Sequence, residues 1–390
     1  MSETGDGQLK IPRTILSEFD GKLDHEFREQ SVLQISGPNC SGKTHIVRQF
    51  MNHYPSDSLL NLSGNNMLER INLMNNDVSY FRSALKGKDI LFIDDAHRVP
   101  KLQDILPSLL EAAPSIKVIT SYSMRAIEDL RQIRIYPISF PTLSKMYAGV
   151  EAVELLNDVM IYGALPEVIL APTTSQKREI LDRIIHSDML RDVFELERIT
   201  NSKALMELLY FLSLNINKSL SVNEISGHIK LNPRTTKRYL EILEKHYIVH
   251  EHKPYKERLK NEITLLSRYY FYDLGIRNAL IMSYGSFNMR SDLEELWANF
   301  LVMERHKYHE LKGLSHSRDY ESFFWETWAG RKVDLLEVDN RVTDAGKIRA
   351  FSFSFNSKTR QNVAPSVFSK HYPETHFKLI TSSNFLEFIT

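Results

Sequence analysis

Short apolar runs separated by amphipathic stretches dominate the first 140 positions of the chain. Runs rich in Val, Ile, Leu and Phe occupy positions 32–35, 59–62, 90–93 and 116–119. Continuous apolar runs of this kind predict strands that are buried on both faces. The stretch 102–113 instead repeats its apolar residues at helical spacing. Alternating strands and helices predict a mostly parallel sheet covered by helices on both faces, so the fold class is α/β.

Beyond about position 150 the hydrophobic pattern becomes helical. Apolar residues recur at spacings of three and four, at Ile180, Ile184, Ile185, Met189 and Val193. This periodicity predicts helices through 151–206. Two more helices are predicted between 219 and 247, because Asn232 is a good N-cap and Pro233 suits the first helical position. A strand at 269–273 follows.

The C-terminal part of the chain returns to strands. A helix begins near Asp292, and the segments 323–328, 332–336 and 350–356 read as strands. Apolar and polar residues alternate most clearly in the last of these segments. The pattern therefore predicts a further α/β unit.

Composition narrows the class of protein. A chain of 390 residues is long enough for two to four domains. Its 49 basic residues equal its 49 acidic residues, so nucleic-acid binding would need a local basic patch. The single cysteine, Cys40, allows no internal disulfide and predicts a reducing, cytoplasmic location. No apolar run has the length of a membrane span, and the polar start is not a signal peptide, so no membrane partner is expected.

The most informative motif lies between the first predicted strand and the helix after it. Positions 37–44 fit G-x-x-x-x-G-K-[ST], whose backbone N–H groups and helix N-terminus favour a bound polyphosphate. Lys43 is expected to reach the β and γ oxygens, and the Thr44 hydroxyl to ligate Mg²⁺. The predicted cofactors are therefore ATP and Mg²⁺. The predicted nucleotide-binding residues are Gly37, Pro38, Asn39, Cys40, Ser41, Gly42, Lys43, Thr44 and His45.

Two aspartates end the predicted strand 90–93. A buried strand followed by carboxylates is the Walker B arrangement, in which the strand delivers an acid to the metal beside the loop threonine. Asp94 is predicted to share the metal with Thr44, and Asp95 to polarise the attacking water. Asp95 is one methylene shorter than glutamate, so binding is a safer expectation than rapid turnover. Ser121, with Thr120 and Ser123, ends the next strand where a γ-phosphate sensor would lie, although turn chemistry gives the same pattern.

These motifs together resemble a prokaryotic family of predicted AAA-type P-loop ATPases. The resemblance is carried by the phosphate loop, by Phe92 to His97, by Ile119 to Ser121, by Pro137 to Phe140, and by the turn Tyr162 to Glu167. Departures are Asp95 for the family's Glu, His97 for its Gln, and Ser121-Tyr122 for its Gly-Ser. An arginine follows the family's sensor strand, and here Arg131 and Arg134 are weak candidates for it, with solvated helix-end charges as the alternative.

The resemblance and the patterns divide the chain into four expected segments. These are an ATPase core at 1–150, a helical lid at 151–206, a winged helix at 207–283 and a nuclease-like domain at 284–390. A purely structural helical bundle is the alternative to the lid.

The second helix of the expected winged helix begins with polar and basic residues. Arg234, Lys237 and Arg238 lie where a recognition helix meets base edges, so DNA is an expected partner. Basic residues of the expected wing are His250, His252, Lys253, Lys256, Arg258 and Lys260. Docking of a protein partner, or self-association into a homo-oligomer, is the alternative use of such a module.

The C-terminal segment resembles a restriction-endonuclease-like core that has lost its active site. Such enzymes need clustered carboxylates and a lysine around a metal. Asp334 stands at the metal position, but Ala298 replaces the helix glutamate, and Ser354 and Asn356 replace the Glu and Lys of the last strand. Glu294 or Glu295, one turn earlier, could serve as a displaced ligand. The domain is expected to be inactive.

The sequence therefore predicts a slow, Mg²⁺-dependent ATPase that acts as a nucleotide-controlled switch and contacts DNA. Two other classes stay open at this point. One is a DNA-binding regulator whose nucleotide site is structural, and the other is an ATP-regulated nuclease.

Overall fold

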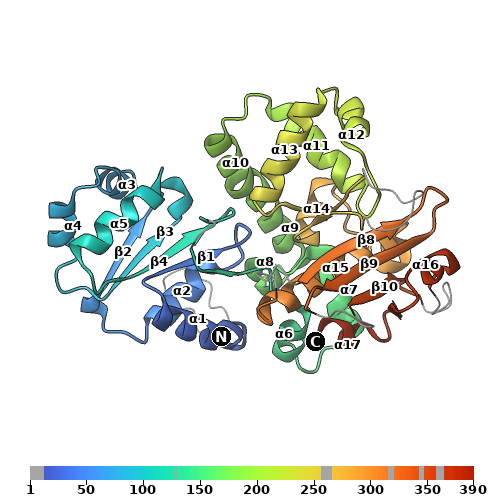
Figure 1. Ribbon diagram of the computed structural model, residues 1–390, viewed down its shortest axis with the longest axis horizontal. Coiled ribbons are helices and arrows are strands. Elements are labelled where there is room, and N and C mark those ends of the chain that lie inside the picture. The colour runs from blue at the N-terminus through green and yellow to red at the C-terminus, as the bar shows by residue number, and fades with distance from the viewer. Residues whose placement is uncertain (1–12, 128–129, 256–265, 315–319, 342–346, 357–363) are drawn as a thin grey trace. The chain divides into compact units, whose positions relative to one another are not determined.

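The computed structural model describes residues 13–127, 130–255, 266–314, 320–341, 347–356 and 364–390 (Figure 1). Contacts divide the chain into two units. Unit 1 comprises residues 1–138, 165–172 and 245–247, and unit 2 comprises 139–164, 173–244 and 248–390. No helix within the described ranges is both long and apolar enough to cross a membrane.

Unit 1 is built on a five-stranded sheet in the order β2-β3-β4-β1-β5, and every neighbouring pair is parallel. Its strands are β1 (Val32–Ser36), β2 (Leu59–Ser63), β3 (Ile90–Asp94), β4 (Lys117–Tyr122) and β5 (Gln132–Arg134). The parallel sheet and strands that the apolar runs predict are confirmed. Because all five strands run the same way, their carboxyl ends meet at one edge, where α/β sheets bind ligands.

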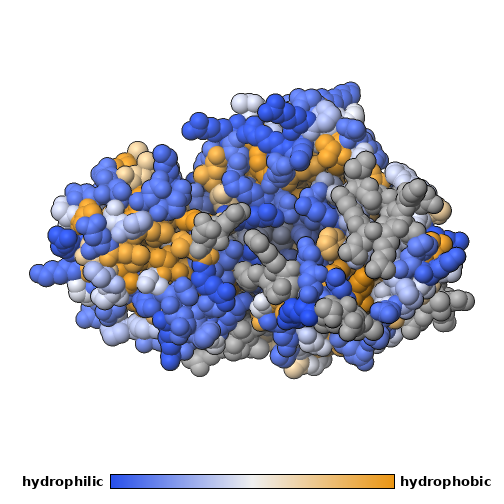
Figure 2. Space-filling model, viewed as in Figure 1, coloured by the Kyte–Doolittle hydropathy of each residue, from blue (hydrophilic) through white to orange (hydrophobic). Residues whose placement is uncertain are grey.

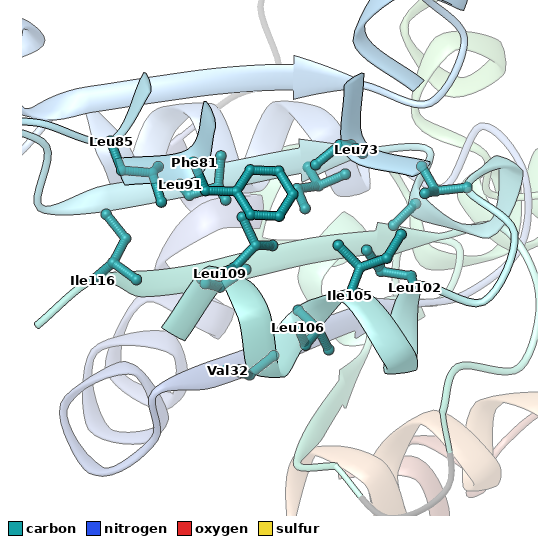
Figure 3. Packing of buried hydrophobic residues seen from close by; sticks show 14 of the residues in the cluster. Val32, Leu73, Phe81, Leu85, Leu91, Leu102, Ile105, Leu106, Leu109 and Ile116 are labelled. Carbon is teal, nitrogen blue, oxygen red and sulfur yellow. The ribbon is translucent and has the colours of Figure 1, made fainter. Parts of the chain in front are cut away.

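Helices cover this sheet on both faces (Figure 1). They are α1 (Arg13–Glu29), α2 (Lys43–Met51), α3 (Met67–Met74), α4 (Val78–Ala84) and α5 (Leu102–Ala112). On one face, Leu91 and Ile93 of β3 pack with Phe81 of α4 and Leu109 of α5 in a buried apolar cluster (Figure 3). Since side chains alternate along a strand, Phe92 projects to the opposite face. This two-sided burial explains why the strands read as continuous apolar runs.

Unit 2 begins with helices and contains two separate β-structures. The helices are α6 (Phe140–Met146), α7 (Ala152–Tyr162), α9 (Thr174–Arg183), α10 (Leu190–Glu197), α11 (Ser202–Leu214), α12 (Val222–Ile229), α13 (Pro233–Lys245), α14 (Leu274–Leu280), α15 (Leu293–Leu311), α16 (Ser366–His371) and α17 (Phe385–Ile389). A π-helical segment, Ile184–Met189, joins α9 to α10. The short helix α8 (Pro166–Leu170) lies between unit 2 segments in the sequence but is part of unit 1.

Helices α12 and α13 precede an antiparallel pair of strands, β6 (Val249–His252) and β7 (Arg268–Phe271). The side chain of Asn232 accepts a hydrogen bond from the Thr235 N–H at 2.8 Å, as expected of a cap. Leu240 and Leu243 bury the inner face of α13. Lys256, Arg258 and Lys260 of the expected wing lie outside the described residues.

The C-terminal strands form a four-stranded sheet in the order β11-β10-β9-β8. Its members are β8 (Tyr320–Glu326), β9 (Lys332–Asp339), β10 (Ile348–Phe353) and β11 (His376–Ile380). Only the pair β10–β11 is parallel within this sheet. Trp325, Val333, Leu336 and Ala350 form its core with Phe368 of α16.

A buried carboxylate joins α7 to α14 within unit 2. Asp273 caps α14, accepting a hydrogen bond from the Gly275 N–H at 2.9 Å, and its other oxygen accepts from the Ala164 N–H at 2.7 Å. Burial raises the pKa of Asp273 above its ordinary value, and the hydrogen bonds from the Ala164, Ile276 and Gly275 N–H groups oppose that rise. The turn after Tyr162, which carries part of the family resemblance, and the Asp273-Leu274-Gly275 segment are therefore two sides of one packing contact.

His252 is buried beside two aromatic rings, those of Tyr270 and Phe324. Its pKa lies well below the ordinary value because burial disfavours the imidazolium, and His250 and Arg268 add to the effect. The unfolded chain therefore takes up a proton near pH 6.5 that the folded chain does not. This contribution to stability is complete above that pH and is lost as the pH falls below it.

Unit 2 is accordingly expected to lose up to about 1.4 kcal/mol of unfolding free energy per pH unit below pH 6.5 through His252 alone. Urea titrations at pH 7.5, 6.5 and 5.5 measure the effect, and His252→Phe is expected to flatten the slope by that amount. His376→Gln, at an exposed position of β11, is the matched control and should leave the slope unchanged. Equal slopes for wild type and His252→Phe would refute the assignment.

Candidate functional site

The loop between β1 and α2 has the backbone shape that its motif predicts. Gly37 has φ of +149°, and a Cβ built there would lie 2.0 Å from the carbonyl oxygen of Ile135. A side chain at this position is excluded, so the glycine lets the loop pass β5 closely. Gly42, with φ of +93°, is the N-cap of α2, and the helix begins at Lys43. The helix N-terminus therefore opens toward the loop, where an anion is favoured.

Lys43 is held inside this loop. Its side chain is buried, and Nζ donates to the carbonyl oxygens of Gly37 at 3.1 Å and Pro38 at 2.6 Å. These bonds keep the ammonium group on the concave side of the loop. A small movement would exchange a carbonyl oxygen for a phosphate oxygen.

Thr44, Asp94 and Ser121 converge at the carboxyl ends of the strands. Asp94 Oδ1 accepts hydrogen bonds from the Thr44 hydroxyl at 2.9 Å and from the Ser121 hydroxyl at 2.5 Å. Ser121 Oγ also accepts from the Asp95 N–H at 2.9 Å. The structure thus brings the predicted metal pair, Thr44 and Asp94, together, and Ser121, near the end of the neighbouring strand β4, contacts both Asp94 and the Asp95 backbone.

This oxygen set fits Mg²⁺. Hydroxyl and carboxylate oxygens are the ligands that a hard divalent cation takes, and Mg²⁺ typically uses only one or two protein groups plus phosphates and water. Within the described residues no group of three or more His, Cys, Asp and Glu side chains could hold a metal by itself. Thr44 and Asp94 would therefore hold the ion only together with phosphate oxygens.

Asp95 adopts an unusual backbone conformation and is tethered by a neighbour. Its φ of 48° places it in the left-handed region, which is uncommon for residues other than glycine. Asn65, just after β2, donates its side-chain N–H to Asp95 Oδ2. The carboxylate predicted to polarise water is thus also bound to an amide.

The loop after β4 is fixed by His97. The Ser123 N–H donates to His97 Nδ1 at 3.3 Å, and Thr120, Ser121 and Ser123 are all buried. His97, a departure from the related family's glutamine, therefore serves as a hydrogen-bond partner of the predicted sensor loop.

A cavity of about 970 Å³ opens over the loop within unit 1. Six of its lining residues belong to the predicted nucleotide set, namely Asn39, Cys40, Gly42, Lys43, Thr44 and His45. Asp95 and Ser123 also line it. The other residues on its wall are Arg48, Gln49, Met51, Asn52, Leu59, Asn61, Pro166 and Glu167, none of which the motif includes.

Two of these additional residues carried a signal in the sequence. Arg48 follows Thr44 by four positions, so both lie on one face of α2. Glu167 follows the Gly163–Pro166 turn that was already singled out as the opening of a lid. Pro166, Val168 and Ile169 of α8 are buried, while Glu167 is half-buried.

Electrostatics separate the three basic side chains on the cavity wall. The pKa of His45 lies below its ordinary value because of burial and the nearby Arg48 guanidinium. His45 is therefore neutral at pH 7, which leaves Lys43 and Arg48 as the cations of the wall. Arg48 NH2 lies 3.9 Å from Asp94 Oδ2.

The two arginines proposed from the sequence do not line this cavity. Arg131 instead forms a bidentate ion pair with Glu26 of α1, with one N–O distance of 2.7 Å, and this pair lowers the pKa of Glu26. Arg134 lies within β5. The interpretation of Arg131 as a structural charge is the one that its contacts favour.

The basic residues of α13 lie on its exposed face. Arg234, Lys237 and Arg238 are all exposed, and Thr236 and Tyr239 are buried beneath them. Lys237 Nζ is 3.9 Å from Glu241, and Arg238 donates to the carbonyl oxygen of Glu197 at 3.0 Å. Hydrophilic residues predominate over α12 and α13 on the face drawn in Figure 2.

A second cavity, of about 320 Å³, lies in unit 2 and includes Asp334 on its wall. Its lining residues are Asn217, Glu294, Ala298, Lys332, Asp334, Phe353 and Ser354. Of the positions compared from the sequence, Glu294, Ala298, Asp334 and Ser354 meet at this cavity, whereas Glu295 and Asn356 are not on its wall. The carboxylate of Asp334 is buried, and its Oδ1 lies 3.6 Å from Arg268 NH1 and 3.7 Å from Lys332 Nζ.

Arg268 compensates the negative charge of Asp334. This fully buried guanidinium also donates to Glu326 at 2.9 Å and stacks on Phe324, 4.3 Å from the ring centroid. Two cations of the protein therefore neutralise the acid at which a metal would be expected. No local sequence pattern indicates this contact, because Arg268 reaches Asp334 from β7.

Comparisons with known proteins agree with this description of the first unit. Residues 29–140 match a sequence family described as an AAA domain, and residues 153–286 match a family described as a domain of unknown function. The chain is 26% identical over 176 residues to an uncharacterised protein of Haemophilus influenzae, covering 42% of this chain and 43% of that protein. It is 23% identical over 245 residues to an uncharacterised protein of Methanocaldococcus jannaschii, covering 55% of each.

The chain thus spans about half the length of these curated relatives. Among solved structures, a Walker-type ATPase of Pyrococcus abyssi aligns with a TM-score of 0.49 at 14% identity, over 71% of this chain and 99% of that one.

Proposed function

We propose that the protein binds ATP with Mg²⁺ and hydrolyses it slowly. The nucleotide state acts as a switch that controls contact of the protein with DNA. The proposal starts from residues 29–140, which match an AAA domain family and have a P-loop ATPase fold. One observation carries this proposal. The Thr44 hydroxyl and the Asp94 carboxylate meet at 2.9 Å directly behind a phosphate loop that already holds its lysine.

Each residue has a distinct role in this account. Backbone N–H groups of the loop and Lys43 bind the phosphates, while Thr44 and Asp94 hold the metal. Bound Mg²⁺ would supply charge neutralisation at the phosphates. Ser121 orients Asp94 through its 2.5 Å hydrogen bond, and its contact with the Asp95 N–H sets the direction of that residue. Asp95 orients the attacking water.

Slow turnover follows from the tether on Asp95. A carboxylate that accepts a hydrogen bond from Asn65 has less capacity to accept one from water.

Asn65→Ala is therefore expected to raise the turnover number several-fold with little change in ATP affinity, and Asp95→Glu is expected to act in the same direction. Steady-state phosphate release measures both. Asn72→Ala, within α3, is the control for the Asn65 variant. Asn66 is unsuitable because its side chain caps that helix. Unchanged turnover in both site variants would show that the hydrogen bond from Asn65 to Asp95 does not slow hydrolysis.

A hydrogen bond supports the switch. Residues 245–247 directly follow α13 and belong to unit 1. The hydroxyl of Tyr247 lies 3.2 Å from the hydroxyl of Ser36, the residue before Gly37. Tyr247 is buried, and its backbone φ is 54°. A change in the phosphate loop can thus reach the helix that carries the basic residues through this hydrogen bond and the short stretch of backbone between Tyr247 and α13.

The proposed DNA contact predicts a specific salt dependence. Lys and Arg that neutralise phosphates release counterions, so the double variant Arg234→Ala/Lys237→Ala should weaken DNA binding and flatten the plot of log affinity against log salt by about one unit per lost contact. Fluorescence anisotropy with duplex DNA at several salt concentrations measures this. Lys203→Ala, at an exposed position of α11, is the matched control. Tyr247→Phe should retain DNA binding but lose its dependence on ATP.

The proposal as a whole is tested by ATP hydrolysis with and without DNA, beside a Lys43→Ala control. Hydrolysis above the control supports the ATPase, and a change on adding DNA supports the switch. Nucleotide binding without hydrolysis would favour the DNA-binding regulator with a structural nucleotide site. The nuclease alternative is disfavoured by Arg268 and Lys332, whose charges already neutralise Asp334.

A further inference from the structure

We propose that Arg48 is a catalytic residue of this site, a cation supplied from the chain's own α2 that contacts the terminal phosphate of ATP. The inference rests on the proposed ATPase function and identifies the arginine that neither Arg131 nor Arg134 provides. Arg48 lies in the second turn of α2, four residues after Thr44, and lines the same cavity as Thr44 and Asp95.

The direction of the Arg48 side chain is the first argument. Side chains on an α-helix lean toward its N-terminus, so a residue in the second turn projects toward the phosphate loop. The contact with Asp94 agrees with this direction. Arg48 NH2 lies 3.9 Å from Asp94 Oδ2, while Thr44 and Ser121 donate to the other oxygen, Oδ1. The guanidinium therefore already reaches Asp94, at the carboxylate oxygen that the two hydroxyls leave unoccupied.

Freedom of movement is the second argument. The Arg48 side chain is 57% exposed and its ion pair is long, so this contact holds it weakly. A divalent cation placed between Thr44 and Asp94 would repel the guanidinium from the carboxylate. The negatively charged oxygens of the γ-phosphate would at the same time attract it. Arg48 is thus expected to exchange its partner Asp94 for the terminal phosphate when Mg²⁺ and ATP bind.

Charge requirements are the third argument. Lys43 and Arg48 are the lysine and arginine side chains on the described cavity wall. The magnesium complex of ATP is still anionic, and negative charge on the γ-phosphate oxygens must be stabilised as the reaction proceeds. A planar guanidinium can donate two parallel hydrogen bonds to such oxygens.

In the reaction, the oxygen of a water molecule bonds to the γ-phosphorus. The bond from that phosphorus to the β–γ bridging oxygen breaks, and its electron pair leaves with ADP. The proton of the water passes to the Asp95 carboxylate and then to solvent, so the products are ADP and inorganic phosphate. Arg48 stabilises the γ-phosphate oxygens throughout and takes no proton, since a guanidinium stays protonated.

The test compares turnover and affinity in four full-length proteins: wild type, Arg48→Ala, Arg48→Lys and the control Arg82→Ala, which alters an exposed residue of α4. Arg48→Ala is expected to lower the turnover number by roughly a thousandfold, the range found for arginines that contact a transferred phosphoryl group. Arg48→Lys should fall between, because it keeps the charge but loses the fork. Calorimetry should show weaker ATP binding by Arg48→Ala and unchanged ADP binding, which also demonstrates that the variant is folded.

A mixing experiment determines whether Arg48 acts in the nucleotide site of its own chain or in that of a neighbouring copy. Arg48→Ala is combined with Lys43→Ala, so that one protein has an intact loop and the other an intact arginine. No activity beyond the sum of the two is expected. Restored hydrolysis would overturn the assignment to the same chain, since Arg48 would then act on a neighbouring copy.

The failures are separable. If wild type hydrolyses ATP no faster than Lys43→Ala, the proposed function is wrong and this inference fails with it. If wild type is active and Arg48→Ala keeps turnover within about threefold, or loses ATP and ADP affinity equally, only the role of Arg48 is wrong.

Discussion

Replacing Lys43 with alanine is expected to abolish ATP hydrolysis and to weaken ATP binding about a hundredfold or more. Its ammonium group already donates two hydrogen bonds, to the carbonyl oxygens of Gly37 and Pro38, so the cation is fixed where phosphate oxygens would bind. Hydrogen bonds from charged groups contribute about 1.5–3 kcal/mol each, and two of them correspond to at least a hundredfold in affinity.

Isothermal calorimetry with ATP and Mg²⁺ measures the loss of binding, and phosphate release measures the loss of turnover. Lys86→Ala removes a lysine that is exposed before β3 and absent from the cavity wall, so it is the matched control. Thermal unfolding of each variant without nucleotide should match wild type. Full ATP affinity in Lys43→Ala would mean that the loop is not the phosphate site.

Replacing Gly163 with alanine is expected to destabilise unit 2 by about 3–5 kcal/mol, at the upper end of single-residue effects. Gly163 has φ of +79°, and a Cβ there would lie 1.9 Å from Asp273 Oδ1. The methyl group would displace the carboxylate from the Ala164 and Gly275 N–H groups. Buried donors and a buried acid would then lose their partners.

Gly149→Ala separates the two causes of this destabilisation. Gly149 has φ of +110°, and a Cβ built there meets nothing within 4 Å. Its replacement should therefore cost only the backbone strain, about 1–2 kcal/mol. Urea denaturation followed by circular dichroism measures both variants. A similar loss for the two variants would show that the contact with Asp273 contributes little.

The nucleotide site was predictable where its chemistry is local in the sequence. The phosphate loop combines the glycines, the lysine and the threonine within nine residues, 36–44. The parallel sheet then brings Asp94 and Ser121 to the same edge, because carboxyl ends of neighbouring parallel strands must meet.

The remaining parts of the site depend on contacts that no local pattern encodes. Asn65 reaches Asp95 because β2 and β3 end side by side, and an asparagine after a strand usually marks only a turn. Glu167 joins the cavity through α8, which is part of unit 1 although its sequence neighbours belong to unit 2. For Arg131, by contrast, the local sequence pattern suggested a role in the site that its contacts do not favour. Its position after the sensor strand fits a catalytic arginine, but Glu26 in α1 binds it.

The ion pair between Arg268 and Asp334 limits which metal site could be engineered at this cavity. An acid introduced at Ser354 and a lysine introduced at Asn356 would supply the missing residue types, yet the Arg268 guanidinium would still compete with any divalent ion for Asp334. Removing Arg268 first would leave Glu326 and Asp334 as uncompensated negative charges in the protein interior. A metal site at Asp334 would therefore require several simultaneous substitutions, since each single change leaves Asp334 either still paired with Arg268 or without a compensating charge.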